Sequence, residues 1–142
     1  MKRGVYMDTQ IIPGERVGKY GLGITYRELI KLFQSENIEH KEKILPTCLK
    51  IETKDMAFLL ENSIVTQITV FGDFKGKLCG TIGIGSSLTE VKEHIGDIKS
   101  GEFDIVPTYE LKDTNGICFE LKDDSDWDED KTPIDAISIF RP

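Results

Sequence analysis

An internal duplication constrains this chain more than any other feature of its sequence. The segment Gly18–Leu29 recurs 62 positions later as Gly80–Val91, with three glycines, a hydroxyl residue and a glutamate in matching places. A later match pairs Met56–Leu60 with Ile117–Leu121 in the same order. Self-similarity of this kind predicts that the 142 residues fold as two similar units.

The two copies differ most near the end of the second one. Ile68–Phe71 returns as Ile137–Phe140 at a spacing of 69, whereas the earlier matches stand 61 or 62 residues apart. The second copy therefore carries about eight additional residues, and these form the acidic segment 123–130.

Each copy contains a capping box, the residue pattern that starts many helices. Thr25 and Glu28 form it in the first copy, and Ser87 and Glu90 form it in the second. Apolar side chains follow at helical spacing, namely Tyr26, Leu29, Ile30 and Phe33, then Leu88, Val91 and Ile95. We expect two amphipathic helices, the first extending to Asn37 and the second shorter.

Three strand-like runs follow each helix, separated by residues typical of turns. They cover residues 47–53, 56–61 and 64–71, then 105–111, 117–122 and 134–140. The predicted fold is therefore α+β, with two tandem repeats that each contain a helix and a three-strand meander. The repeats, about 12–74 and 75–142, form one domain whose antiparallel sheets lie side by side, with both helices on one face and the other face open.

The charge distribution favours some partners over others. The formal net charge of −7 divides into +1 for residues 1–71 and −8 for residues 72–142. An acidic surface repels nucleic acid and anionic membranes, so we expect neither as a partner and instead expect a basic protein or a cation. No apolar run approaches the roughly 20 residues of a membrane helix.

Residues typical of catalysis or cofactor binding form no recognisable set. His40 and His94 occupy unmatched places in the two copies, and the spaced glycines run in the reverse order of a dinucleotide-binding motif. Asp124, Asp126 and Asp128 have calcium-loop spacing, but Glu129 stands where such a loop needs glycine. We therefore predict a protein that is not an enzyme and has no metal or cofactor.

Cysteine usage bears on the cellular compartment. Cys48, Cys79 and Cys118 are odd in number and widely spaced, which favours reduced thiols. The first 14 residues contain no apolar segment typical of a secretory signal. Both observations favour a cytoplasmic location.

The acidic segment is the candidate partner-binding site. A tryptophan among acids indicates either folding back onto the core or contact with a partner, since tryptophan is frequent at interface hot spots. The predicted contact residues are Asp123, Asp124, Asp126, Trp127, Asp128, Glu129 and Asp130. The alternatives are a solvated loop with no role and a calcium loop.

Taken together, the glycines, the capping-box residues, the Phe-containing strand and the final Ile-x-Val-Phe strand suggest a family. They resemble the repeat unit of the beta-lactamase inhibitor protein and outer-membrane assembly lipoprotein group. The tandem arrangement resembles the inhibitor proteins, and this resemblance implies a concave sheet that faces a target enzyme. The chain departs from the family in lacking paired cysteines within each copy. It is also similar in size and acidity to bacterial immunity proteins, which neutralise a toxin domain.

These observations predict a non-enzymatic protein-binding module, namely an immunity or inhibitor protein for a toxin or enzyme with a basic surface. One alternative is a small-ligand-binding or enzymatic protein that uses a cleft between the repeats. Another is a structural domain that self-associates through an exposed edge strand. The identity of the partner and the oligomeric state do not follow from the sequence.

Overall fold

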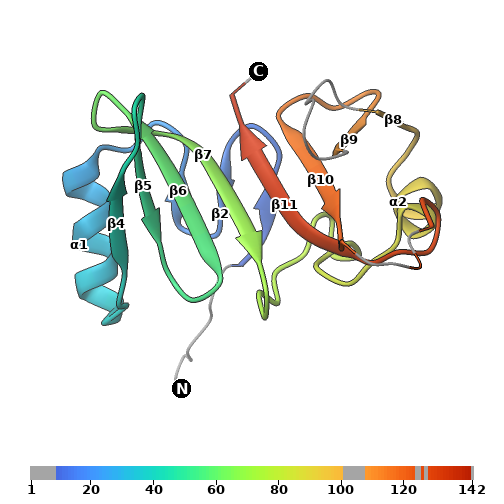
Figure 1. Cartoon of the computed structure of the whole chain (residues 1–142), viewed down its shortest axis with the longest axis horizontal. Coiled ribbons are helices and arrows are strands. Elements are labelled where there is room, and N and C mark those ends of the chain that lie inside the picture. The colour runs from blue at the N-terminus through green and yellow to red at the C-terminus, as the bar shows by residue number, and fades with distance from the viewer. Residues whose placement is uncertain (1–8, 101–107, 124–125, 127, 142) are drawn as a thin grey trace.

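A large antiparallel sheet dominates the computed structural model, which describes residues 9–100, 108–123, 126 and 128–141 (Figure 1). Its eight strands lie in the order β4-β5-β6-β7-β11-β10-β9-β8. They are β4 (Lys41–Ile44), β5 (Leu49–Glu52), β6 (Met56–Glu61), β7 (Ile64–Phe71), β8 (Ile98–Ser100), β9 (Thr108–Leu111), β10 (Ile117–Leu121) and β11 (Ile134–Phe140).

A smaller sheet and two helices complete the structure. The small sheet contains β1 (Ile11–Ile12), β2 (Arg16–Val17) and β3 (Tyr20–Gly21), and the helices are α1 (Tyr26–Glu36) and α2 (Leu88–His94). Neither of these helices is long and apolar enough to cross a bilayer, and no other helix occurs in the residues described.

The prediction of an α+β fold made of two tandem helix-plus-three-strand repeats is wrong. Strand predominates among the residues described, with 41% strand and 14% helix. Four strands, not three, follow each helix, and they join into a single eight-stranded sheet. The small sheet was not predicted at all. The additional strands β4 and β8 are short edge strands of mainly polar residues, which do not show the alternation that identifies a half-buried strand.

Both capping boxes are confirmed. In the first, the Thr25 hydroxyl oxygen accepts from the Glu28 amide at 3.1 Å, and the Glu28 carboxylate accepts from the Thr25 amide at 2.9 Å. Ser87 and Glu90 make the equivalent pair. As predicted, α1 ends at Asn37, which has a left-handed conformation, and α2 is the shorter helix, with 7 residues against 11.

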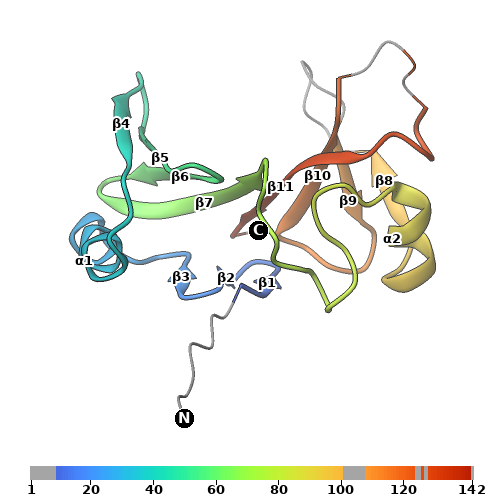
Figure 2. The same cartoon turned by 90° about the horizontal axis from the view of Figure 1, so that it is seen from below.

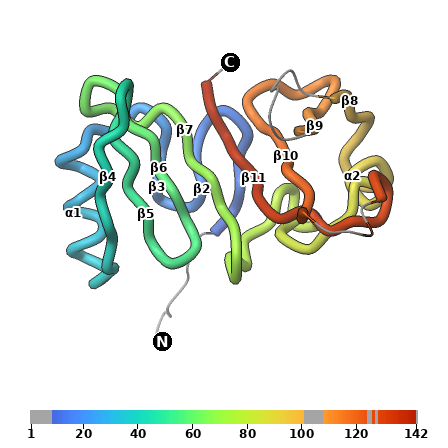
Figure 3. Tube along the Cα trace, in the orientation of Figure 1, coloured from blue at the N-terminus to red at the C-terminus, as the bar shows by residue number. Residues whose placement is uncertain are grey.

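A continuous row of apolar side chains runs across both halves of the large sheet. The opposed residues are Ile51, Phe58, Ile68, Ile139 and Ile117, each at most 1% exposed. The pairing of β7 with β11 places Ile68 opposite Ile139, although these residues are far apart in the sequence. Figure 3 shows these two strands side by side at the centre of the molecule. The halves therefore share one core.

Phe58 connects three structural layers. Its ring lies 5.6 Å from Phe33 of α1 and 5.3 Å from Tyr20 of the small sheet, both in edge-on geometry. Tyr20 and Phe33 are themselves 5.8 Å apart. This aromatic cluster packs α1 and the small sheet against the same face of the large sheet (Figure 2).

The small sheet also contacts both halves of the large sheet. The Gly23 amide donates to the Val65 carbonyl of β7 at 2.8 Å, and the Gly14 amide donates to the Gly116 carbonyl beside β10 at 3.1 Å. Gly116 has a φ of +84°, and a Cβ atom there would lie 2.8 Å from the Gly14 Cα. This close approach requires glycine at position 116.

We predict that Phe58→Ala lowers the free energy of unfolding by about 3–5 kcal/mol, because it leaves a cavity where three layers meet. Leu59→Ala is the matched control, since its half-buried side chain lies on the opposite face of the same strand. Urea unfolding followed by circular dichroism measures both losses. Equal losses would contradict the role assigned to the aromatic cluster.

Candidate functional site

The face of the large sheet opposite the helices is the candidate functional site. Because side chains alternate along a strand, the residues on either side of Phe58, Ile68 and Ile139 point toward this face. We call it the helix-free face. It includes Lys50, Glu52, Ala57, Leu59, Gln67, Thr69, Phe71, Thr108, Glu110, Cys118, Glu120, Ala136, Ser138 and Phe140. Figure 2 shows that the β4–β5 hairpin rises from one end of the sheet on this side, and the chain leaving β10 rises from the other.

A polar row crosses the seam between the two halves on this face. The Gln67 side-chain amide donates to the Thr69 hydroxyl at 3.3 Å, and the hydroxyls of Thr69 and Ser138 are 2.7 Å apart. Ser138 is opposite Cys118 in the β10–β11 register, and both are buried, at 4% and 7% exposure. Side-chain hydrogen bonds therefore reinforce the backbone pairing of β7 and β11.

Two glutamates flank Cys118 on the same face. Glu110 lies opposite Cys118 in the β9–β10 pairing, and Glu120 lies two residues along β10. Both glutamates are half-buried, and neither has a hydrogen bond or ion pair with any described residue. The hydroxyl of Thr108, opposite Glu120, is also buried without a partner in the structure. Two carboxylates and an unsatisfied hydroxyl thus lie close together, and the exposed Lys99 of β8 is opposite Glu110 at the edge of the sheet.

The environment of Cys118 keeps its thiol in the protonated form. Burial raises the pKa of the Cys118 thiol to about 11, and the charges of Glu120 and Glu110 add to the increase, although hydrogen bonds with Ser138 act in the opposite direction. The thiol is therefore protonated at neutral pH, whereas a nucleophilic cysteine needs the thiolate. Unpaired carboxylates on a sheet face are suited to contact a cationic group.

The acidic segment is divided between described and undescribed residues. Asp123, Asp126, Asp128, Glu129 and Asp130 are exposed. Asp124 and Trp127, the other two predicted contacts, lie outside the described residues. A partner-binding role for the segment stays a prediction.

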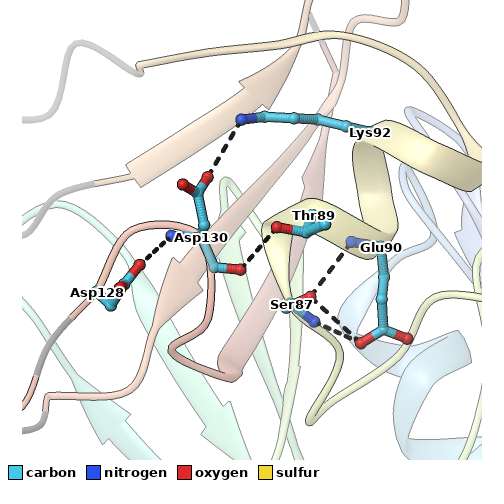
Figure 4. A network of polar contacts seen from close by, with 6 residues as sticks. All are labelled: Ser87, Thr89, Glu90, Lys92, Asp128 and Asp130. Carbon is cyan, nitrogen blue, oxygen red and sulfur yellow. Dashed lines mark hydrogen bonds and ion pairs between the residues drawn. The ribbon is translucent and has the colours of Figure 1, made fainter.

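The end of this segment forms a turn attached to α2 (Figure 4). The Asp128 carboxylate accepts from the Asp130 amide at 2.8 Å. The Asp130 carbonyl accepts from the Thr89 hydroxyl at 3.0 Å, and its carboxylate lies 3.4 Å from the Lys92 ammonium. Asp128 and Asp130 therefore have structural roles within the chain, which any partner contact would have to share.

One histidine contacts neighbouring side chains, and the other is at the end of a helix. His40 packs against the Phe33 ring at 5.1 Å, and its Nε2 lies 3.2 Å from a Glu42 carboxylate oxygen. His94 is the last residue of α2. Within the described ranges, no group of three or more His, Cys, Asp or Glu side chains is arranged to hold a metal ion.

No sequence pattern singles out the glutamates at positions 110 and 120. A hairpin signal at residues 113–116 predicts that the flanking strands pair, and alternation around Cys118 places Glu120 on its face. The register that brings Glu110 opposite Cys118 was the missing information, because a shift of one residue would turn its side chain to the other face.

Comparison with known proteins gives a fold and no function. No protein-family model and no curated protein sequence matches the chain. Among solved structures, it is similar to the uncharacterized protein YfeY from Escherichia coli, with a TM-score of 0.57 and 10% sequence identity. The match covers 94% of this chain and 97% of that chain. At this level of identity, the similarity extends to the fold alone.

The raised pKa of Cys118 predicts that the fold loses stability in alkaline solution. The unfolded thiol, with its ordinary pKa of 9.0, releases its proton first, so the stabilisation is present below pH 9.0 and is lost as the pH rises to about 11. Cys118→Ala should reduce the fall in unfolding free energy between pH 8 and 10, measured by urea titration. Cys48→Ala, at a half-buried position, is the control, and an equal effect of both substitutions would contradict this explanation.

Proposed function

We propose that this protein is a non-enzymatic binding module of the cytoplasm, an inhibitor or immunity protein that covers a basic surface of a toxin or enzyme with its helix-free face. The observation that carries the proposal is the pair of half-buried glutamates at positions 110 and 120, which form no ion pair with any residue that the structure describes. Three free cysteines are compatible with the reducing cytoplasm.

The positions of these two glutamates support a cationic partner. Two carboxylates that lie near one another on a sheet face create a local negative potential. A lysine or arginine from another protein would be attracted to it, and arginine can bind a carboxylate through two parallel hydrogen bonds.

Apolar side chains next to the acids support a protein partner rather than a free cation. Leu59, Phe71 and Phe140 are half-buried on the helix-free face, on the strands beside the seam. Protein interfaces commonly combine aromatic or apolar centres with polar surroundings. The concave sheet implied by the resemblance to inhibitor proteins would present these residues in the same way.

The acidic segment would assist association. Its exposed carboxylates carry much of the −8 charge of residues 72–142. Charges at the edge of an interface increase the association rate and change its dependence on salt more than they change final affinity. We therefore assign two separate roles. The acids at positions 123–130 attract the partner, and Glu110 and Glu120 contact it in the complex.

The test is affinity capture from lysate of the native organism, followed by kinetic measurements with the purified partner. We expect a basic protein whose retention falls at high salt. Glu110→Lys combined with Glu120→Lys should raise the dissociation constant at least about 100-fold, since truncating a buried charge pair costs roughly 2–5 kcal/mol. Lys substitutions at Asp123, Asp124 and Asp126 should mainly slow association.

The matched control is Glu93→Lys combined with Glu39→Lys, which makes the same charge change at exposed positions on and beside the helices. This variant should retain most of the affinity. An equal loss of affinity in both double variants would show that only net charge matters and would overturn the assignment of the helix-free face. Absence of any captured protein by the folded chain would argue against the function itself.

A further inference from the structure

A cleft of about 850 Å³ is lined by elements on the helix side of the large sheet, away from the helix-free face. The end of α1, the small sheet, the β5–β6 turn and the chain after β7 surround it, so it lies within the first half of the molecule and not between the halves. Its apolar lining consists of Val17, Tyr20, Phe33, Ile38, Met56 and Phe74. Sites for small molecules commonly have volumes of this size and are mainly apolar with a few polar groups.

Tyr20 contributes a hydroxyl group that can still form a hydrogen bond. The residue is 8% exposed, its ring packs on Phe33 and Phe58, and its hydroxyl has no hydrogen-bond partner among the residues described. Burial raises the pKa of this phenol to about 12, and the charges of Glu36 and Asp55 add to the increase. The hydroxyl is therefore neutral at physiological pH, and its oxygen can accept a hydrogen bond from a ligand.

Acidic side chains outnumber basic ones in the lining, which favours a cationic ligand: the acids are Glu36, Glu39, Asp55 and Asp73, and the bases are Lys19, Lys54 and Lys75. Glu36 already has a partner, because its carboxylate lies 2.8 Å from the Lys19 ammonium. Asp55 is half-buried and has no ion pair within the described part of the chain. Lys54 and Lys75 also line the cleft, but both are exposed and neither is paired with Asp55. A carboxylate and a hydroxyl oxygen, neither bonded to another described side chain, are thus available beside the apolar lining of the cleft.

We propose that this cleft binds a small aromatic amine, with its ring against Ile38 and Phe74 and its ammonium group donating to the Asp55 carboxylate and the Tyr20 hydroxyl oxygen. Aromatic faces also attract cations directly, which favours an amine over a neutral ligand. The proposal is independent of the proposed protein-binding function, since the two sites lie on opposite faces of the large sheet.

Two indole probes with the same ring and opposite charges test this inference. Tryptamine carries an ammonium group and indole-3-propionate carries a carboxylate, and each would be titrated into the full chain labelled with nitrogen-15. We expect tryptamine to shift the amide signals of Tyr20, Phe33 and Met56 in a saturable way. Its dissociation constant should be lower than that of indole-3-propionate by about tenfold or more, as expected for a charged hydrogen bond.

Two substitutions that each remove one negative charge distinguish a specific contact with Asp55 from general electrostatic attraction to an acidic protein. Asp55→Asn should remove the preference for tryptamine over indole-3-propionate, whereas Asp97→Asn, on the exposed chain after α2, should leave it unchanged. Tyr20→Phe should weaken tryptamine binding and leave the spectrum of the folded chain otherwise similar.

Three results would each overturn the proposal. They are equal affinities for the two indoles, shifts confined to residues outside the cleft, and no saturable tryptamine binding. The comparison of the two probes on the unmodified chain is sufficient by itself, so the test does not depend on whether a substituted chain folds.

Discussion

The antiparallel pairing of β7 with β11 is the interaction on which the rest of this structure depends. It joins Ile68 to Ile139 in the core and Thr69 to Ser138 on the opposite face, so both surfaces of the sheet are continuous across the seam. Without it, each half would expose an unpaired strand and part of its apolar face to water. The small sheet reinforces the seam through backbone hydrogen bonds from Gly23 to β7 and from Gly14 to the start of β10.

The sequence predicted those elements whose signals are local. The capping boxes located both helices, and the predicted strands at 56–61, 64–71 and 134–140 have the observed limits. β4 was missed because Lys41, Glu42 and Lys43 are charged and exposed, and an edge strand needs only one neighbour. The two-residue strands of the small sheet were missed because their formation depends on contacts with distant positions, including Val65 and Gly116.

The functional surfaces were harder to predict than the elements. A run of acids is conspicuous in a sequence, so the segment 123–130 was selected, and part of it is used within the chain to hold a turn against α2. Glu110 and Glu120 become neighbours only when the β9–β10 register is known. The cleft beside Tyr20 is formed by segments from four parts of the chain, and no local pattern indicates that they meet. Both surfaces are consequences of tertiary structure.

The position of the seam also has a consequence for folding kinetics. Every other pair of neighbouring strands in the large sheet belongs to one local meander, but β7 and β11 are separated by the whole second half of the chain. Closing so long a loop is entropically costly, so we expect the two meanders to form first and their union to limit the folding rate. Until then, the free edges of β7 and β11 could pair with those of another molecule, which would produce a dimer by exchange of halves.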